Sequence, residues 1–167
     1  RLVMAAHKEN MKAPGLFASE AVQQMERHAT QLLQRATNCL NLDEVPDALK
    51  KSWRHEGVLF HKEIFDRIEL PPFEKIPDAR TLEAQREYKK IAGPLRWQVP
   101  NTKIFITLVE EGPRQGEFLF APEIIPHLDE FVEQVKHLPY KAGPSVSPGL
   151  LQFYDSHFGG LAPPKWS

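Results

Sequence analysis

The spacing of apolar positions is helical along most of the chain and becomes strand-like near its middle. Apolar residues recur every three or four positions over about 19–40, 45–69 and 122–138, which predicts three amphipathic helices. Residues 81–91 are polar but rich in helix-forming types, so we expect a fourth and exposed helix there. Ser19 is a candidate N-cap for the first helix, since its hydroxyl can accept from the first turn.

The segment 95–120 has the alternating pattern of strands. Ile104, Ile106 and Leu108 would share one face of a strand, with Phe105 and Val109 on the other. A loop rich in glycine and proline follows, and residues 117–120 can then return as an antiparallel strand. We therefore predict an α+β fold, mainly helical, with a small antiparallel three-stranded sheet or hairpin over about 95–120 that helices cover.

The remaining segments predict little regular structure. The first fifteen residues fit a frayed lead or a short helix, and residues 139–167 form a tail rich in proline and glycine. One short helix is expected in that tail, around 150–157. With 167 residues and no internal repeat, the chain 1–167 is expected to form a single soluble domain.

Composition and charge narrow the classes of partner. The chain is 41% hydrophobic and 26% charged, values that are ordinary for a globular protein. Its 21 basic and 22 acidic residues give a net charge of −1 and no general attraction for nucleic acid. No stretch approaches the about 20 apolar residues that a membrane span requires.

Candidate catalytic and metal-binding residues fail on their spacing. His55 and His61 lie six positions apart on a predicted helix, so about 240° of rotation separates them, whereas a zincin pair is four apart. The seven histidines fit a dispersed surface set, and the single cysteine, Cys39, fits a small buried apolar residue. A small hydrolase or metal enzyme that uses His55, His61 and nearby acidic residues is one hypothesis, which this spacing argues against.

Other catalytic signals are also missing. Glu63 and Asp66 fit a solvated helix face, with Arg67 as an ion-pair partner. The chain has no nucleophile elbow, no phosphate loop and no dinucleotide fingerprint. We therefore predict a protein that is not an enzyme and that holds no cofactor and no metal.

Two surface features are candidate contact sites. The first is the loop with Glu110, Glu111 and Arg114, which is either a plain hairpin loop or a contact loop. The second is Lys165 with Trp166, a pair that fits a membrane-proximal anchor and equally a tail that folds back on its own domain.

Several short segments resemble a known family when they are taken in order. They are Cys39-Leu40-Asn41-Leu42-Asp43, the stretch Lys62–Leu70 with its Asp66-Arg67 pair, Ile76-Pro77-Asp78, Trp97–Thr102, Val109–Phe120, His137–Tyr140 and Pro163–Trp166. This order resembles the N-terminal extramembrane region of bacterial small-conductance mechanosensitive ion channel proteins. Val109–Phe120 is the most specific segment. No pore segment of the family has a counterpart here, so no pore residue is transferred.

The resemblance implies a Gram-negative periplasmic domain that precedes the first membrane helix, on the periplasmic side of the inner membrane. It implies a non-catalytic accessory role in assembly, gating modulation or periplasmic contacts. The implied partners are further copies, held through a membrane part outside these residues, and the membrane surface or cell-wall components. The alternative is a free-standing periplasmic ligand- or protein-binding module.

Overall fold

The computed structural model describes residues 2–12 and 20–158. In chain order its elements are α1 (Leu2–Lys12), α2 (Glu20–Thr37), α3 (Asp47–Phe65), η1 (Phe73–Lys75), α4 (Ala79–Lys89), β1 (Arg96–Gln98), β2 (Phe105–Leu108), β3 (Phe118–Phe120), η2 (Pro122–His127), α5 (Leu128–Val135) and α6 (Leu150–Phe158). Here η1 and η2 are 3-10 helices.

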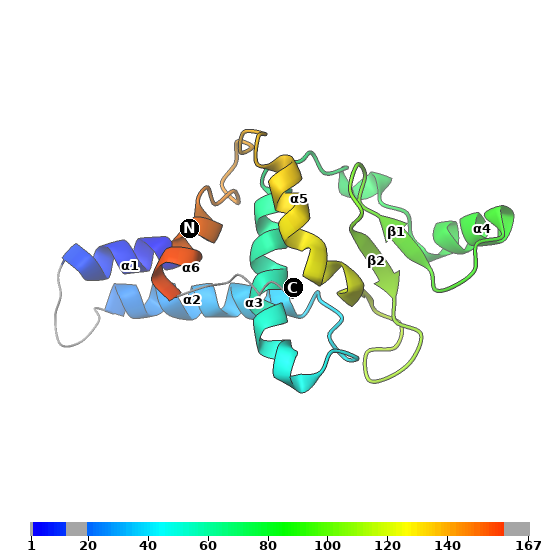
Figure 1. Ribbon diagram of the computed structural model, residues 1–167, viewed down its shortest axis with the longest axis horizontal. Helices are drawn as coiled ribbons and strands as arrows, with labels where there is room; N and C mark the ends of the chain where they lie inside the picture. The colour runs from blue at the N-terminus through cyan, green and yellow to red at the C-terminus, as the bar shows by residue number, and fades with distance from the viewer. Residues whose placement is uncertain (1, 13–19, 159–167) are drawn as a thin grey trace, which may run out of the picture.

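Helix α3 stands at the centre of the molecule (Figure 1). It contacts α2, α5, α6 and η2, while α1 packs along α2. The sheet lies on the other side of α3 and α5 from α1 and α2, and α4 projects beyond the sheet. None of the described helices combines the length and the apolar character needed to cross a bilayer.

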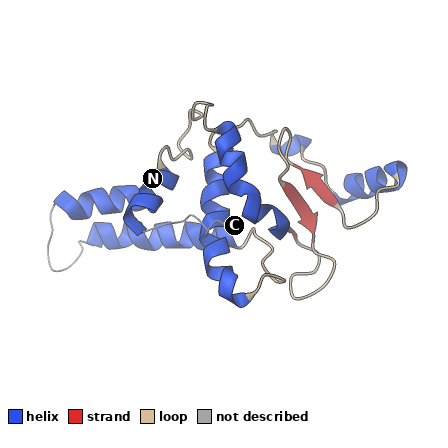
Figure 2. Ribbon diagram, in the orientation of Figure 1, coloured by secondary structure: helices blue, strands red, loops and turns tan. Residues whose placement is uncertain are grey.

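The strands form one antiparallel sheet in the order β1-β2-β3 (Figure 2). Ile106 in the middle strand faces Trp97 on one side and Phe120 on the other. A further parallel bridge joins Phe120 to Leu40, so the segment after α2 continues the sheet at its β3 edge. The predicted α+β fold is therefore confirmed: it is mainly helical, with a small three-stranded antiparallel sheet packed against helices.

One core joins the sheet to the helices. Its buried members come from the 40–45 segment, α3, both ends of the β1–β2 turn, η2 and α5; they are Leu40, Leu42, Val45, Phe60, Ile64, Val99, Ile104, Ile125, Leu128 and Phe131. The helix-interior Gly57 is explained by this packing. A Cβ there would lie 2.8 Å from Leu40 Cδ1, so an alanine at this position would require the end of the Leu40 side chain to shift.

Two predicted helices differ from the structure at one end. The segment expected as one helix over 122–138 begins as the 3-10 helix η2, because Pro126 has no N–H to donate to an α-helical ladder. The helix expected to run to residue 69 ends at Phe65, where the amides of Asp66 and Arg67 close its last turn on Lys62 O and Ile64 O. The proposed N-cap Ser19 lies outside the described residues.

Candidate functional site

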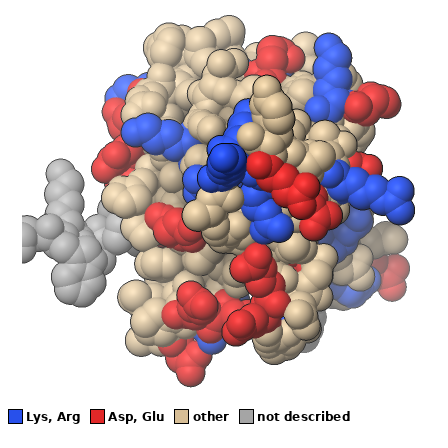
Figure 3. Space-filling view, turned by 90° about the vertical axis from the view of Figure 1, so that its right-hand side faces the viewer, with Lys and Arg blue, Asp and Glu red and all other residues tan. Residues whose placement is uncertain are grey.

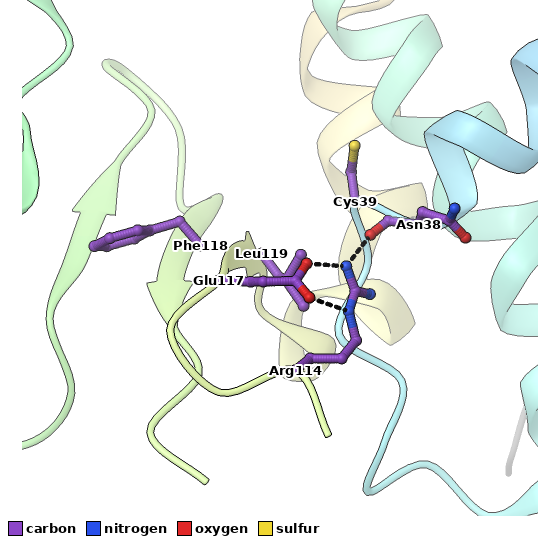
Figure 4. Close-up of a pocket in the computed structure, with 6 residues that line it drawn as sticks. All are labelled: Asn38, Cys39, Arg114, Glu117, Phe118 and Leu119. Carbon is purple, nitrogen blue, oxygen red and sulfur yellow. Dashed lines mark hydrogen bonds and ion pairs between the residues drawn. The ribbon is translucent and has the colours of Figure 1, made fainter. Parts of the chain in front are cut away.

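The hairpin loop between β2 and β3 is attached to the end of α2 by one arginine. Arg114 Nη2 donates to Asn38 O at 2.6 Å (Figure 4). Its Nη1 donates to Leu40 O at 3.3 Å. Glu117 completes the arrangement, since its carboxylate accepts from Arg114 Nε at 3.3 Å and from Nη2 at 2.5 Å. Gly112 and Gly116 both have φ of +89°, which the loop needs in order to turn back.

We call the bonds of Arg114 to Glu117, Asn38 O and Leu40 O the first joint. They keep the side chains of Arg114 and Glu117 charged. The hydrogen bond from Arg114 holds the pKa of Glu117 below its ordinary value, and Glu117 in turn raises the pKa of Arg114. The guanidinium thus binds one carboxylate and two main-chain carbonyl groups of its own chain. The three residues of the predicted contact loop therefore differ. Arg114 binds groups of its own chain, whereas Glu110 and Glu111 are exposed.

A shallow depression of about 670 Å³ lies beside this joint (Figure 4). Its lining residues are Asn38, Cys39, Arg114, Glu117, Phe118 and Leu119. Cys39 is exposed here, so its expected burial is wrong. Its main chain explains why: Cys39 O accepts from Phe120 N at 2.8 Å, and the thiol, left outside the sheet, donates to Arg35 O at 3.5 Å.

A second joint attaches the end of α3 to the segment after α5. Glu63 is 3% exposed and its Oε1 accepts from Arg67 Nη2 at 2.7 Å and from the Tyr140 hydroxyl at 2.7 Å. Arg67 also donates to the carbonyl groups of Lys136 and Leu138, and its guanidinium lies 3.8 Å from the centre of the Tyr140 ring. Burial raises the pKa of Tyr140, which keeps its hydroxyl a donor.

Asp66 extends the second joint. It is 5% exposed; its Oδ2 accepts from Ser147 N at 2.9 Å, and its main-chain oxygen accepts from Lys141 N at 2.8 Å. Lys62 forms an ion pair with the other carboxylate oxygen. The prediction that Glu63 and Asp66 lie on a solvated helix face is therefore wrong, although Arg67 is the ion-pair partner that was expected for Glu63.

His61 contradicts the prediction that the histidines form a dispersed surface set. It is 5% exposed, with its ring centre 4.6 Å from that of Phe120 and 5.6 Å from that of Phe65. Nδ1 donates to Gly57 O at 2.6 Å, whereas Nε2 has no hydrogen-bond partner in the described part of the chain. Burial lowers the pKa of His61 to about 4, so the ring is neutral at pH 7.

The described residues offer no group of three or more His, Cys, Asp and Glu side chains that could hold a metal ion. His55, the other member of the histidine pair, is half-buried and its Nδ1 contacts Lys51 O at 3.1 Å. His61 and His55 therefore each bond the preceding turn of α3. Lys165 and Trp166, the predicted anchor, lie outside the described residues.

The sequence did not predict the buried polar network of Arg67, Glu63 and Asp66, because their partners are distant in the chain. The partners of Arg67, Glu63 and Asp66 lie 71, 77 and 81 positions further along the chain. The burial of His61 had a signal, since it lies four positions after Gly57 and four before Phe65, on one helical face. No sequence signal of comparable strength indicated the burial of Glu63 and Asp66.

No protein-family model matches the chain, and neither a curated protein nor a solved structure does. Its function is therefore inferred from its own residues and contacts.

Proposed function

We propose that this chain is a non-catalytic extramembrane accessory domain of a mechanosensitive ion channel-like membrane protein, placed on the periplasmic side of a bacterial inner membrane. Its role is in assembly, gating modulation or periplasmic contacts. The observation that supports the proposal most is where the resembling segments lie: the distinctive polar residues of four of them form the two joints of the fold.

At the first joint, Val109–Phe120 meets the Cys39–Asp43 segment. Arg114 comes from one segment, while Leu40 O and the main chain of Cys39 come from the other. The two segments are brought together by a side chain that reaches across 74 positions of sequence. The arginine, the glycines and the glutamate of this loop thus have a structural use.

At the second joint, Lys62–Leu70 meets His137–Tyr140. Arg67 and Glu63 from α3 bind the Leu138 carbonyl group and the Tyr140 hydroxyl. Charged hydrogen bonds in a water-poor site are among the stronger ones in proteins, and removing one partner leaves a buried charge unpaired. These polar groups bind one another and so stabilise the fold, and this arrangement does not favour their binding a reacting substrate.

A domain with such joints suits a mechanical accessory role. The first joint attaches the β2–β3 loop to the end of α2, and the second attaches the segment after α5 to the end of α3. Each joint would resist separation of the two segments that it connects. This is what a domain coupled to gating or to subunit assembly requires.

The proposal is tested with the complete reading frame that contains this chain, expressed in bacteria without mechanosensitive channels and exposed to hypo-osmotic shock. We expect it to restore survival, and we expect Arg67→Ala to reduce that protection at an unchanged level of membrane-inserted protein. Lys8→Ala, an exposed change on α1, is the matched control. A reading frame that encodes no hydrophobic spans, or that gives no protection, would sink the proposal.

A free-standing binding module is the second candidate, and one cavity favours it. A largely apolar cavity of about 390 Å³ lies between α2, α3, α6 and the 144–147 segment, with Leu33, Val58 and Leu150 among its lining residues. This volume is in the range of ligand pockets. Fluorescence titration of the purified chain with an apolar naphthylamine probe tests it. Saturable binding that Val58→Trp abolishes would favour the module, and no saturable binding would exclude it.

A further inference from the structure

A groove with only basic charge runs between α4 and β1. Its volume is about 380 Å³, and its charged lining residues are Arg86, Lys89 and Arg96. No ion pair joins any of the three to a carboxylate of the described chain. Arg86 donates only to Gly93 O, at 3.4 Å, and the Arg96 guanidinium lies 4.9 Å from the centre of the Phe105 ring.

A second groove, of about 320 Å³, has only acidic charge. Five carboxylates line it, from Asp43, Glu44, Glu110, Glu111 and Glu123. None of the five has an ion pair within the part of the chain that the structure describes. Asp43 also interacts electrostatically with Arg114. A basic partner placed on this groove would meet five carboxylates of like charge, which attract it.

The two grooves are neighbours on one face of the molecule. Pro94 lines both of them, and Arg96 of the basic groove pairs across the sheet with Thr107 of the acidic groove. Figure 3 looks at the side that carries the sheet and α4. Lys and Arg side chains spread across its middle, with some Asp and Glu side chains among and above them, and further Asp and Glu side chains gather below. The separation of charge is clearest in the two grooves, which we call the basic half and the acidic half of this face.

We propose that two copies of this chain pair through this face, with the basic groove of each against the acidic groove of the other. A two-fold axis along the boundary between the halves places each groove on its complement in both directions at once. This is the self-complementarity that a symmetric dimer interface requires. The inference does not depend on the proposed channel role.

Aromatic and apolar surface in and beside the basic groove supplies contact area. Trp97 and Phe105 line the groove, and Ile91 at its edge is 45% exposed. On α4, which buries only Leu82, Tyr88 is 88% exposed. Arginine and aromatic side chains are enriched in protein interfaces. Since exposed ion pairs each contribute at most about 1 kcal/mol, the pairing is expected to be of modest affinity and sensitive to salt.

The test is sedimentation velocity of the 167-residue chain over a series of concentrations. The unaltered chain is expected to show a monomer–dimer equilibrium that shifts to monomer between about 0.1 M and 1 M salt, where the Debye length falls from about 10 Å to about 3 Å. Arg86→Glu with Arg96→Glu makes both halves acidic. The triple change Glu110→Arg, Glu111→Arg and Glu123→Arg makes both halves basic, because the acidic groove then has three arginines and two carboxylates. Each of these two variants alone is expected to be monomeric.

Mixing the two charge-reversal variants is the decisive step, because the acidic halves of one then meet the basic halves of the other. We expect a 1:1 heterodimer from two proteins that do not self-associate. The control, Lys8→Glu with Arg27→Glu, reverses two exposed charges on α1 and α2 and is expected to dimerise like the unaltered chain. If a reversal variant is misfolded by circular dichroism, the milder Arg86→Gln with Arg96→Gln replaces it. A chain that is monomeric throughout, or variants that do not pair when mixed, would overturn the proposal.

Discussion

His61 makes the stability of this protein depend on pH in a calculable way. The ring is buried beside Phe65 and Phe120, and its Nε2 has no acceptor within reach among the described residues. A proton added to Nε2 would therefore place an unpaired positive charge in the core. Because burial lowers the pKa of His61 to about 4, the folded protein resists this protonation, whereas the unfolded chain accepts it near an ordinary pKa of about 6.5.

The sign and size of the effect follow from linkage. A histidine whose folded pKa is lowered stabilises the protein fully above pH 6.5, and this stability is lost as the pH falls through 6.5 toward 4. The difference between pKa values of about 6.5 and about 4 corresponds to roughly 3 kcal/mol in total, of which about 2 kcal/mol is lost between pH 8 and pH 5. Within that window the largest slope is about 1.2 kcal/mol per pH unit.

Urea unfolding followed by tryptophan fluorescence measures this slope, since Trp53 and Trp97 are packed against the core. His61→Leu is expected to remove the about 2 kcal/mol difference in free energy of unfolding between pH 8 and pH 5. His55→Leu is the matched control on the same helix, and we expect it to retain the difference. Carboxyl groups that titrate in the same pH range contribute equally to both variants, so their effect on the free energy of unfolding cancels in the comparison. An unchanged acid slope in His61→Leu, or an NMR pKa near 6.5 for His61, would refute the reasoning.

Three further predictions concern packing and the two joints, and equilibrium urea unfolding at pH 7 measures each. Arg114→Ala removes the bonds to Asn38 O, Leu40 O and Glu117 and should destabilise the protein by about 1–2 kcal/mol, more than Arg114→Lys does; equal losses would contradict the role of the fork. Tyr140→Phe leaves Glu63 with one bond fewer and should cost about 1–2 kcal/mol, and a neutral result would show that this joint is weak. Gly57→Ala places a Cβ 2.8 Å from Leu40 Cδ1, but alanine also gains about 1 kcal/mol over glycine inside a helix, so the net loss should be about 0–2 kcal/mol. If Gly57→Ala is no better tolerated together with Leu40→Val, close packing is not the reason for the glycine.

The sequence predicted the local elements well because periodicity is a local property. The helical face of α3 and the alternation in β2 follow from side-chain spacing alone, and the turn after β2 follows from Gly112 and Pro113. The difference at η2 is also local, since Pro126 lies within the expected helix and has no N–H to donate. Helix α1 could be placed only as one of two alternatives.

The joints could not be predicted in the same way. Helical spacing gives Glu63 a partner at Arg67, but it does not show that Tyr140 and Leu138 O close over them. Likewise, Arg114 has an evident neighbour in Glu117 and distant ones at the end of α2. Burial of charged groups depends on which distant segment covers them, and that is a property of the whole fold.

We propose that this chain is part of a mechanosensitive ion channel-like membrane protein. Patch-clamp recording tests it most directly, on giant spheroplasts of a strain without mechanosensitive channels that express the complete reading frame. Under suction we predict stretch-activated currents that are absent from the parent strain and whose gating threshold shifts in Arg67→Ala. Confirmed membrane insertion of the protein without any stretch-activated current would contradict the claim.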